Sequence, residues 1–257
     1  MLGVDDRGQD DGMSRRDWVR LGLVAAGGAA AAATGITLLG PMLYQSPRPT
    51  EEFRNTIVYT RFPTYQWWNA RADETIRLTD FQEWQGATGV WRARYQDGQR
   101  VEQTGQPVLV IRVKRDDSVF SAPAPGTVFL PEPYRLYYDD PTRDLRIVVL
   151  LDRSTHLCCY PGWHVVTDPP PGRDYIAASP TYQVYGLDPI YDVCHGGQWD
   201  PMALELAVNP RINETYVGAR MVRGPGFGPL PVIPVRAIED QLAGILAYPD
   251  WYTYCSP

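Results

Sequence analysis

Two short stretches of this chain each place a histidine within a few residues of a cysteine. The first, Ser154–Cys159, reads Ser-Thr-His-Leu-Cys-Cys, and the second, Asp192–Gly197, reads Asp-Val-Cys-His-Gly-Gly. Together they hold two of the three histidines and three of the four cysteines of the chain. Paired stretches of this kind are typical of two loops that meet around a metal ion or a disulfide. The sequence therefore predicts that the two stretches are loops that lie close together.

The pair resembles the two cluster-binding loops of Rieske iron–sulfur proteins, whose patterns are C-T-H-x-G-C and C-P-C-H-G-S. The two histidine ligands of the family match His156 and His195. The two cysteine ligands fall on Ser154 and Asp192, so both thiolates are replaced by oxygen groups. The resemblance covers about residues 107–230 and implies a Rieske-type antiparallel β-sandwich with a small cluster-binding subdomain.

A disulfide is also implied by the resemblance. The bridging cysteines of the family match Cys159 and Cys194. The alternative is that both remain free, buried thiols. Cys158 and Cys255 are left over, and they can form a second bridge or stay free, because sequence does not give connectivity.

A segment rich in glycine and proline follows the second stretch. Residues 224–230 resemble the loop that covers the cluster in Rieske domains, and Gly224, Pro225 and Pro229 are the residues expected to fix its turns. This position after the second stretch is the one that the resemblance implies.

Three occupancies of the site remain open. A Rieske centre binds one iron through two histidines and the other through two thiolates, whereas Ser154 and Asp192 offer hard oxygen donors. The resemblance implies a [2Fe–2S] cluster at these two residues and the two histidines. The alternatives are a single zinc or iron ion on His156, His195 and Asp192, or no metal. We expect the cluster to be lost and the fold to be kept.

The resemblance also carries functional expectations. Intact Rieske proteins transfer electrons from a quinol to a cytochrome at the extracytoplasmic face of a membrane. The chain is therefore expected to be a membrane-anchored subunit of a quinol–cytochrome c reductase-like, bc-type respiratory complex. Its expected partners are a cytochrome b-type subunit and other subunits of the complex, with quinol as a further candidate. The alternatives are a cluster-free structural or assembly subunit, and an exported protein with a mononuclear metal site.

The N-terminus resembles an export signal followed by an anchor. Residues 14–19 contain the twin arginines Arg15 and Arg16. Residues 21–47 carry no charge, and the run exceeds the roughly 20 residues that cross a bilayer. Because Arg20 and the twin arginines precede the run, we expect a single-pass protein of the cell membrane with its main domain on the extracytoplasmic side. A cleaved signal peptide is the alternative.

Beyond the anchor, the chain is expected to be mainly β. Its 24 prolines and 23 glycines separate short segments rich in β-branched and aromatic residues, as in antiparallel all-β domains. The expected strands are residues 56–59, 89–95, 107–113, 145–151, 182–185 and 216–222. Residues 237–246 have apolar residues spaced by three and four, which predicts a helix.

The chain is acidic, and it is expected to divide into five segments. The net charge is −6 and Lys114 is the only lysine, so no basic patch for nucleic acid is expected. The expected segments are a cytoplasmic tail (1–20), an anchor (21–47), a hinge and base β region (48–106), a Rieske-like domain (107–230) and a C-terminal segment (231–257).

Overall fold

Strands dominate the part of the chain that the computed structural model describes, which comprises residues 52–63, 65–157, 159–163, 190–192, 194–210, 212–226 and 228–245. All pairings between named strands are antiparallel. The prediction of a mainly β, antiparallel protein is therefore confirmed. Two short 3-10 helices, η1 (Asn69–Arg71) and η2 (Leu78–Asp80), are the helices of these residues.

Several expectations fall outside the described residues. These are the tail and anchor at residues 1–47, the strand expected at residues 182–185, and the two remaining cysteines, Cys158 and Cys255. Among the residues that are described, no helix has the length and apolar character needed to cross a membrane.

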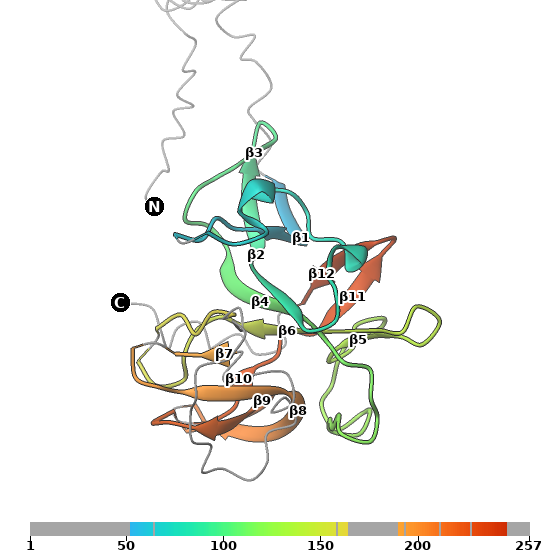
Figure 1. The fold of residues 1–257 in the computed structure, drawn as a ribbon, viewed down its shortest axis with the longest axis vertical. Coiled ribbons are helices and arrows are strands. Elements are labelled where there is room, and N and C mark those ends of the chain that lie inside the picture. Colours follow the sequence, from blue (N-terminus) through green and yellow to red (C-terminus); the bar gives the residue numbers. More distant parts are fainter. Residues whose placement is uncertain are drawn as a thin grey trace, which may run out of the picture. The chain divides into compact units, whose positions relative to one another are not determined.

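The larger sheet runs in the order β11-β12-β1-β2-β4-β6-β5, with β3 paired to the end of β2 (Figure 1). Its strands are β1 (Glu52–Tyr59), β2 (Gln85–Gln96), β3 (Gln99–Arg100), β4 (Gln106–Val113), β5 (Tyr138–Asp140), β6 (Leu145–Leu151), β11 (Val235–Ile238) and β12 (Gln241–Gly244). Because β4 pairs with both β2 and β6, this sheet spans the expected boundary between residues 106 and 107.

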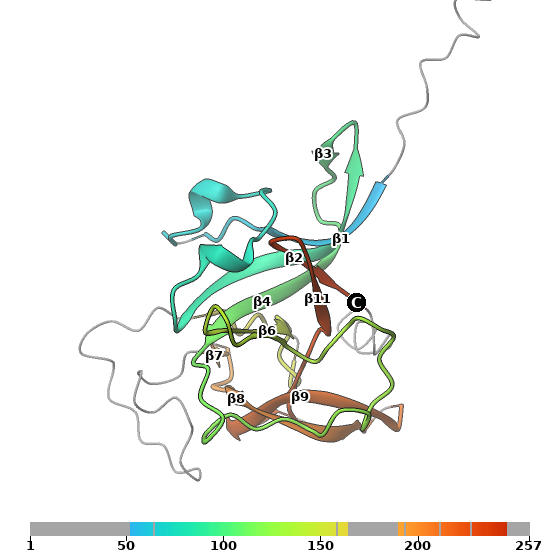
Figure 2. The ribbon, with the colours of Figure 1, turned by 90° about the vertical axis from the view of Figure 1, so that its right-hand side faces the viewer.

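The smaller sheet runs in the order β10-β9-β8-β7. Its strands are β7 (Ile190–Tyr191), β8 (Gln198–Asn209), β9 (Glu214–Arg223) and β10 (Leu230–Pro231). Figure 2 shows β8 and β9 as a layer on one side of β4 and β6. With these bounds, the strands expected at residues 56–59, 89–95, 107–113, 145–151 and 216–222 are all confirmed.

Strand β6 is apolar along nearly its whole length because both of its faces are covered. Ile147 and Val149 point into one buried cluster, which includes Ile57 and Trp91 of the larger sheet. Val148 and Leu150 point into a second cluster, to which the smaller sheet contributes residues such as Trp199 and Val217. A strand buried on both faces shows a continuous hydrophobic run in place of alternation.

The two sheets are joined by the segment after β10. The Val232 N–H donates to Val217 O of the smaller sheet at 2.9 Å, and the Ile233 N–H donates to Val149 O of the larger sheet at 2.8 Å. Val235 then exchanges two backbone hydrogen bonds with Arg135, at 2.8 and 2.9 Å. This crossing fixes the smaller sheet, and the loops that it carries, against β6.

The helix predicted at residues 237–246 is wrong, because this stretch forms most of the hairpin β11–β12. Ile238 pairs with Gln241 across a two-residue turn in which Glu239 has φ 55°. Ala243 pairs with Thr56 of β1, and the Leu78 N–H donates to Asp240 O at 2.8 Å. Over so short a stretch, the spacing of the apolar residues fits a helix as well as a strand. Pairing with the edge of β1 favours the strand.

Candidate functional site

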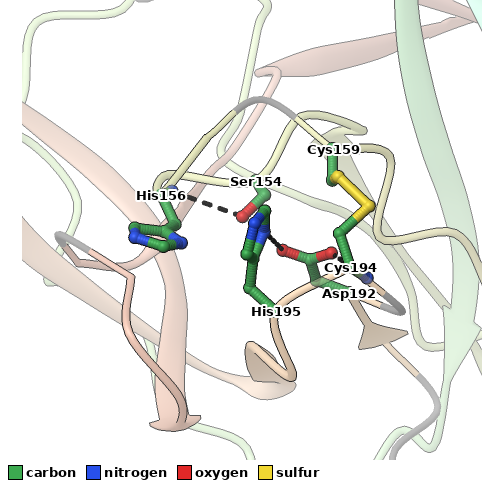
Figure 3. The surroundings of a disulfide bond; sticks show 6 residues. All are labelled: Ser154, His156, Cys159, Asp192, Cys194 and His195. Atoms are coloured by element: carbon green, nitrogen blue, oxygen red, sulfur yellow. Dashed lines mark hydrogen bonds and ion pairs between the residues drawn. A yellow bond between two sulfur atoms is a disulfide. The ribbon is translucent and has the colours of Figure 1, made fainter.

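The two histidine- and cysteine-bearing stretches are loops that meet. The first loop follows β6, and the second connects β7 to β8. A disulfide joins Cys159 of the first loop to Cys194 of the second, with Cα atoms 6.4 Å apart (Figure 3). The predicted disulfide is therefore confirmed.

The first loop is closed by its own backbone. The Ser154 N–H donates to Cys159 O at 2.7 Å, which holds the cysteine beside the end of β6. The His156 N–H donates to the Ser154 hydroxyl at 3.3 Å. Ser154 and Thr155 are buried, so the hydroxyl of Ser154 faces inward at the position expected for a ligand.

The second loop is organised by Asp192, whose side chain is fully buried. The Cys194 N–H donates to Asp192 Oδ1 at 2.8 Å, an Asx-type turn that sets the direction of the cysteine. The Asp192 N–H donates to Gly197 O at 2.8 Å, and the Gly196 N–H returns a bond to Asp192 O at 2.7 Å. These bonds hold Asp192 Oδ1 against the Cys194 N–H and leave Oδ2 on the side of His195.

The segment after β9 contacts both loops, as expected for a cover. Gly228 O accepts hydrogen bonds from the Thr155 hydroxyl at 3.0 Å and from Trp199 Nε1 at 3.1 Å. A Cβ on Gly224 would lie 2.6 Å from Gly196 O, so this segment approaches the second loop closely. Of the other predicted cover residues, Pro225 is exposed, and Pro229 O accepts a hydrogen bond from the Tyr216 hydroxyl at 3.0 Å.

The predicted site residues gather on one side of the disulfide. The rings of His156 and His195 lie 4.7 Å apart between centroids, at 89° to each other. Figure 3 shows the His195 ring between the His156 ring and the Asp192 carboxylate. The distance from His195 Nδ1 to Asp192 Oδ2 is 3.6 Å, and Oδ2 accepts no hydrogen bond from any described residue.

One group of donor atoms among the described residues is close enough to bind a metal ion. It comprises the sulfurs of Cys159 and Cys194, an oxygen of Asp192 and a nitrogen of His195, all within 4.8 Å of one another. Asp192 is buried, whereas Cys194 and His195 are exposed. While the sulfurs are bonded to each other they carry no thiolate charge, and only the carboxylate and the imidazole are available as ligands.

The donors do not fit a [2Fe–2S] cluster. In a Rieske centre the histidines and the thiolates bind different irons. Here the atom at a histidine position, His195 Nδ1, and the atom at a thiolate position, Asp192 Oδ2, are 3.6 Å apart. Two ligands on a single tetrahedral ion lie about 3.4 Å apart, so this spacing suits one ion. The oxygen donors of Ser154 and Asp192 are also hard ligands where a cluster requires sulfur.

Sequence reasoning missed one buried acid beside the site. Asp152 follows β6, its side chain is fully buried, and its Oδ1 accepts a hydrogen bond from the Gly162 N–H at 2.9 Å. Burial raises the pKa of this carboxyl to about 6. The signal in the sequence was an acidic residue directly after a continuous hydrophobic run, two positions before Ser154.

Comparisons with known proteins leave the family open. No protein-family model matches the sequence. No curated protein matches it either.

Proposed function

We propose that this chain is a Rieske-type, membrane-anchored subunit of a bc-type quinol–cytochrome respiratory complex, in which it serves as a docking or assembly subunit. The observation that carries the proposal is the pair of loops joined by the Cys159–Cys194 disulfide, with His156 and His195 facing each other. The anchor and its extracytoplasmic orientation are proposed from the twin arginines and the uncharged run of residues 21–47.

The docking role is favoured because the donor set does not suit electron transfer through a cluster. Ser154 and Asp192 supply oxygen where two thiolates are required. The loops nevertheless keep the disulfide and the covering segment. We infer that these features hold the loops in a fixed conformation, as a docking surface requires.

The outer face of the first loop suits contact with an apolar partner. Leu157, which directly follows His156, is 61% exposed, and Tyr160, which directly follows Cys159, is 52% exposed. Contiguous exposed apolar patches mark interaction sites on protein surfaces, and we propose that Leu157 and Tyr160 belong to such a patch. A cytochrome b-type subunit embedded in the membrane is the partner proposed for this face.

Co-purification from native membranes tests the proposal. We expect the tagged full-length chain to bring down a b-type haem protein, detected by its reduced-minus-oxidised absorption spectrum. Leu157→Asp is expected to lower the yield of that haem by about tenfold, which corresponds to about 1.4 kcal/mol of docking energy. Leu206→Asp is the matched control, because Leu206 is an exposed leucine (43%) on β8, away from the loops.

A second measurement tests the absence of redox chemistry. We expect reduced membranes to show no Rieske-type electron paramagnetic resonance signal from this chain. A chain that purifies alone in mild detergent, with no haem protein attached, would contradict the docking role. A Rieske-type signal that follows the tagged chain would contradict the assignment of a cluster-free subunit.

A further inference from the structure

The Asp192 carboxylate is buried, and only one of its two oxygens accepts a hydrogen bond from a described residue. The side chain is fully buried, Oδ1 accepts the Cys194 N–H, and Oδ2 accepts no hydrogen bond from a described residue. The nearest polar partner of Oδ2 is His195 Nδ1 at 3.6 Å, which is beyond hydrogen-bond length. Buried carboxylates are normally paired with hydrogen-bond donors or with metal ions.

The disulfide lies on the other side of the same point. Both sulfurs are within 4.8 Å of the Asp192 and His195 donor atoms. The newly synthesised chain carries Cys159 and Cys194 as thiols, and in that state the group offers two sulfurs, one nitrogen and one oxygen. These are ligands that zinc accepts in tetrahedral sites.

We propose that, when the Cys159–Cys194 disulfide is reduced, Cys159, Cys194, Asp192 and His195 together bind one Zn²⁺ ion. The site and the disulfide are then alternative ways of joining the same two loops. Binding releases the two thiol protons, because thiolates are the metal ligands. A disulfide-bearing oxidant ejects the ion: the two thiolates give up two electrons to it and form the S–S bond, while the oxidant takes up these electrons and two protons from water and becomes a dithiol.

The loop geometry leaves room for this exchange. Two thiolates on one zinc ion lie about 3.8 Å apart, given Zn–S bonds of about 2.3 Å. The Cα atoms of the two cysteines are 6.4 Å apart, toward the wide end of the range for disulfides. Separation of the sulfurs therefore requires side-chain rotation and little movement of the backbone. The exposure of Cys194 and His195 gives the ion a path to solvent.

The ligand set differs from the one that the resemblance would select. His156 faces the His195 ring but is not among the residues whose donor atoms lie within 4.8 Å of one another. Ser154 accepts a backbone hydrogen bond within its own loop. Both residues are expected to be dispensable for zinc, which makes them matched controls from the same two loops. The inference rests on the side-chain geometry alone and needs no membrane partner.

Zinc titration of the purified full-length chain, in detergent and in a Cys158→Ser/Cys255→Ser background, tests the proposal. A water-soluble phosphine reduces the disulfide to two thiols and is itself converted to the phosphine oxide. We expect one equivalent of Zn²⁺ to bind to the reduced chain and none to the oxidised chain, with a chromophoric chelator as competitor. Asp192→Asn and His195→Ala should each weaken binding at least about 100-fold, whereas His156→Ala and Ser154→Ala should change it less than threefold.

Cobalt substitution identifies the ligands directly. We expect the reduced chain with Co²⁺ to show the intense d–d bands of a tetrahedral ion and a sulfur-to-cobalt charge-transfer band. Equal zinc binding by the oxidised chain, loss of binding in His156→Ala, or no saturable binding after reduction would each overturn the proposal. Thermal unfolding of each metal-free variant shows whether it is folded. If Asp192→Asn does not fold, the His195→Ala variant and the charge-transfer band decide the outcome.

Discussion

The carboxylate of Asp152 accepts a hydrogen bond of 2.9 Å from the backbone N–H of Gly162, which ties the end of β6 to the chain beyond the first loop. Its second oxygen accepts no hydrogen bond from the residues that the structure describes. Burial is the main cause that raises the pKa of Asp152 from 3.8 to about 6, against the Gly162 hydrogen bond and the Arg153 charge, which lower it.

The pH dependence of stability follows from this raised pKa. The folded state holds the proton of Asp152 more tightly than the unfolded state, so the neutral carboxyl stabilises the fold below about pH 4. That contribution is lost as the pH rises toward 6. We predict that Asp152→Asn raises the free energy of unfolding by up to about 3 kcal/mol at pH 7.5 and changes it little at pH 4. Urea denaturation at both pH values measures this, and equal effects at the two values would contradict it.

Loss of the disulfide should be costly. The bond closes a loop of 35 residues, which corresponds to about 4 kcal/mol in the chain-entropy model. We predict that Cys159→Ser/Cys194→Ser lowers the free energy of unfolding by this amount, measured by urea denaturation with a chelator present. Reduction of the wild-type chain should reproduce the loss. If the free energy of unfolding of the wild-type chain were the same with and without reductant, the disulfide would not be the main stabilising link between the loops.

The close approach of the covering segment depends on Gly224. Its φ is +100°, and an added Cβ would lie 2.6 Å from Gly196 O and 2.6 Å from Gly197 Cα, both backbone atoms. We predict that Gly224→Ala lowers the free energy of unfolding by about 3 kcal/mol, measured by denaturant titration. Gly98→Ala is the matched control, because Gly98 has φ +75° but nothing within 4 Å of the added Cβ, and should cost about 1 kcal/mol. Equal losses in the two variants would mean that the close approach contributes nothing.

Restoring both thiolates should restore the cluster that the donor set now excludes. Ser154→Cys with Asp192→Cys supplies sulfur at both positions and removes the 3.6 Å contact of Asp192 with His195. We predict that the double variant takes up iron and sulfide on anaerobic reconstitution and shows a Rieske-type paramagnetic resonance signal when reduced. Each single variant is the control and should show no such signal. A double variant that binds neither iron nor sulfide would indicate that the pocket no longer has the shape of a Rieske site.

Much of the fold could be predicted because local patterns and tertiary packing agree there. Apart from Arg112 and Arg146, residues 107–113 and 145–151 are apolar, and they form β4 and β6, the strands covered on both faces. The prediction for residues 237–246 is wrong because ten residues are too short for apolar spacing to separate a helix from two short strands. The edge of β1, at Thr56, supplied the hydrogen bonds that no local pattern contains.

For the candidate site, the sequence determined which groups are present. Two histidines and two cysteines lie in two similar stretches, and oxygen groups stand where the resembling family has thiolates. Only the tertiary structure decided their distances: it joined Cys159 to Cys194 and set Asp192 Oδ2 beside His195 with no hydrogen bond from a described residue. The physical reason is that residue types follow from the chain alone, whereas the spacing of atoms across two loops depends on how β6, β7 and β8 pack.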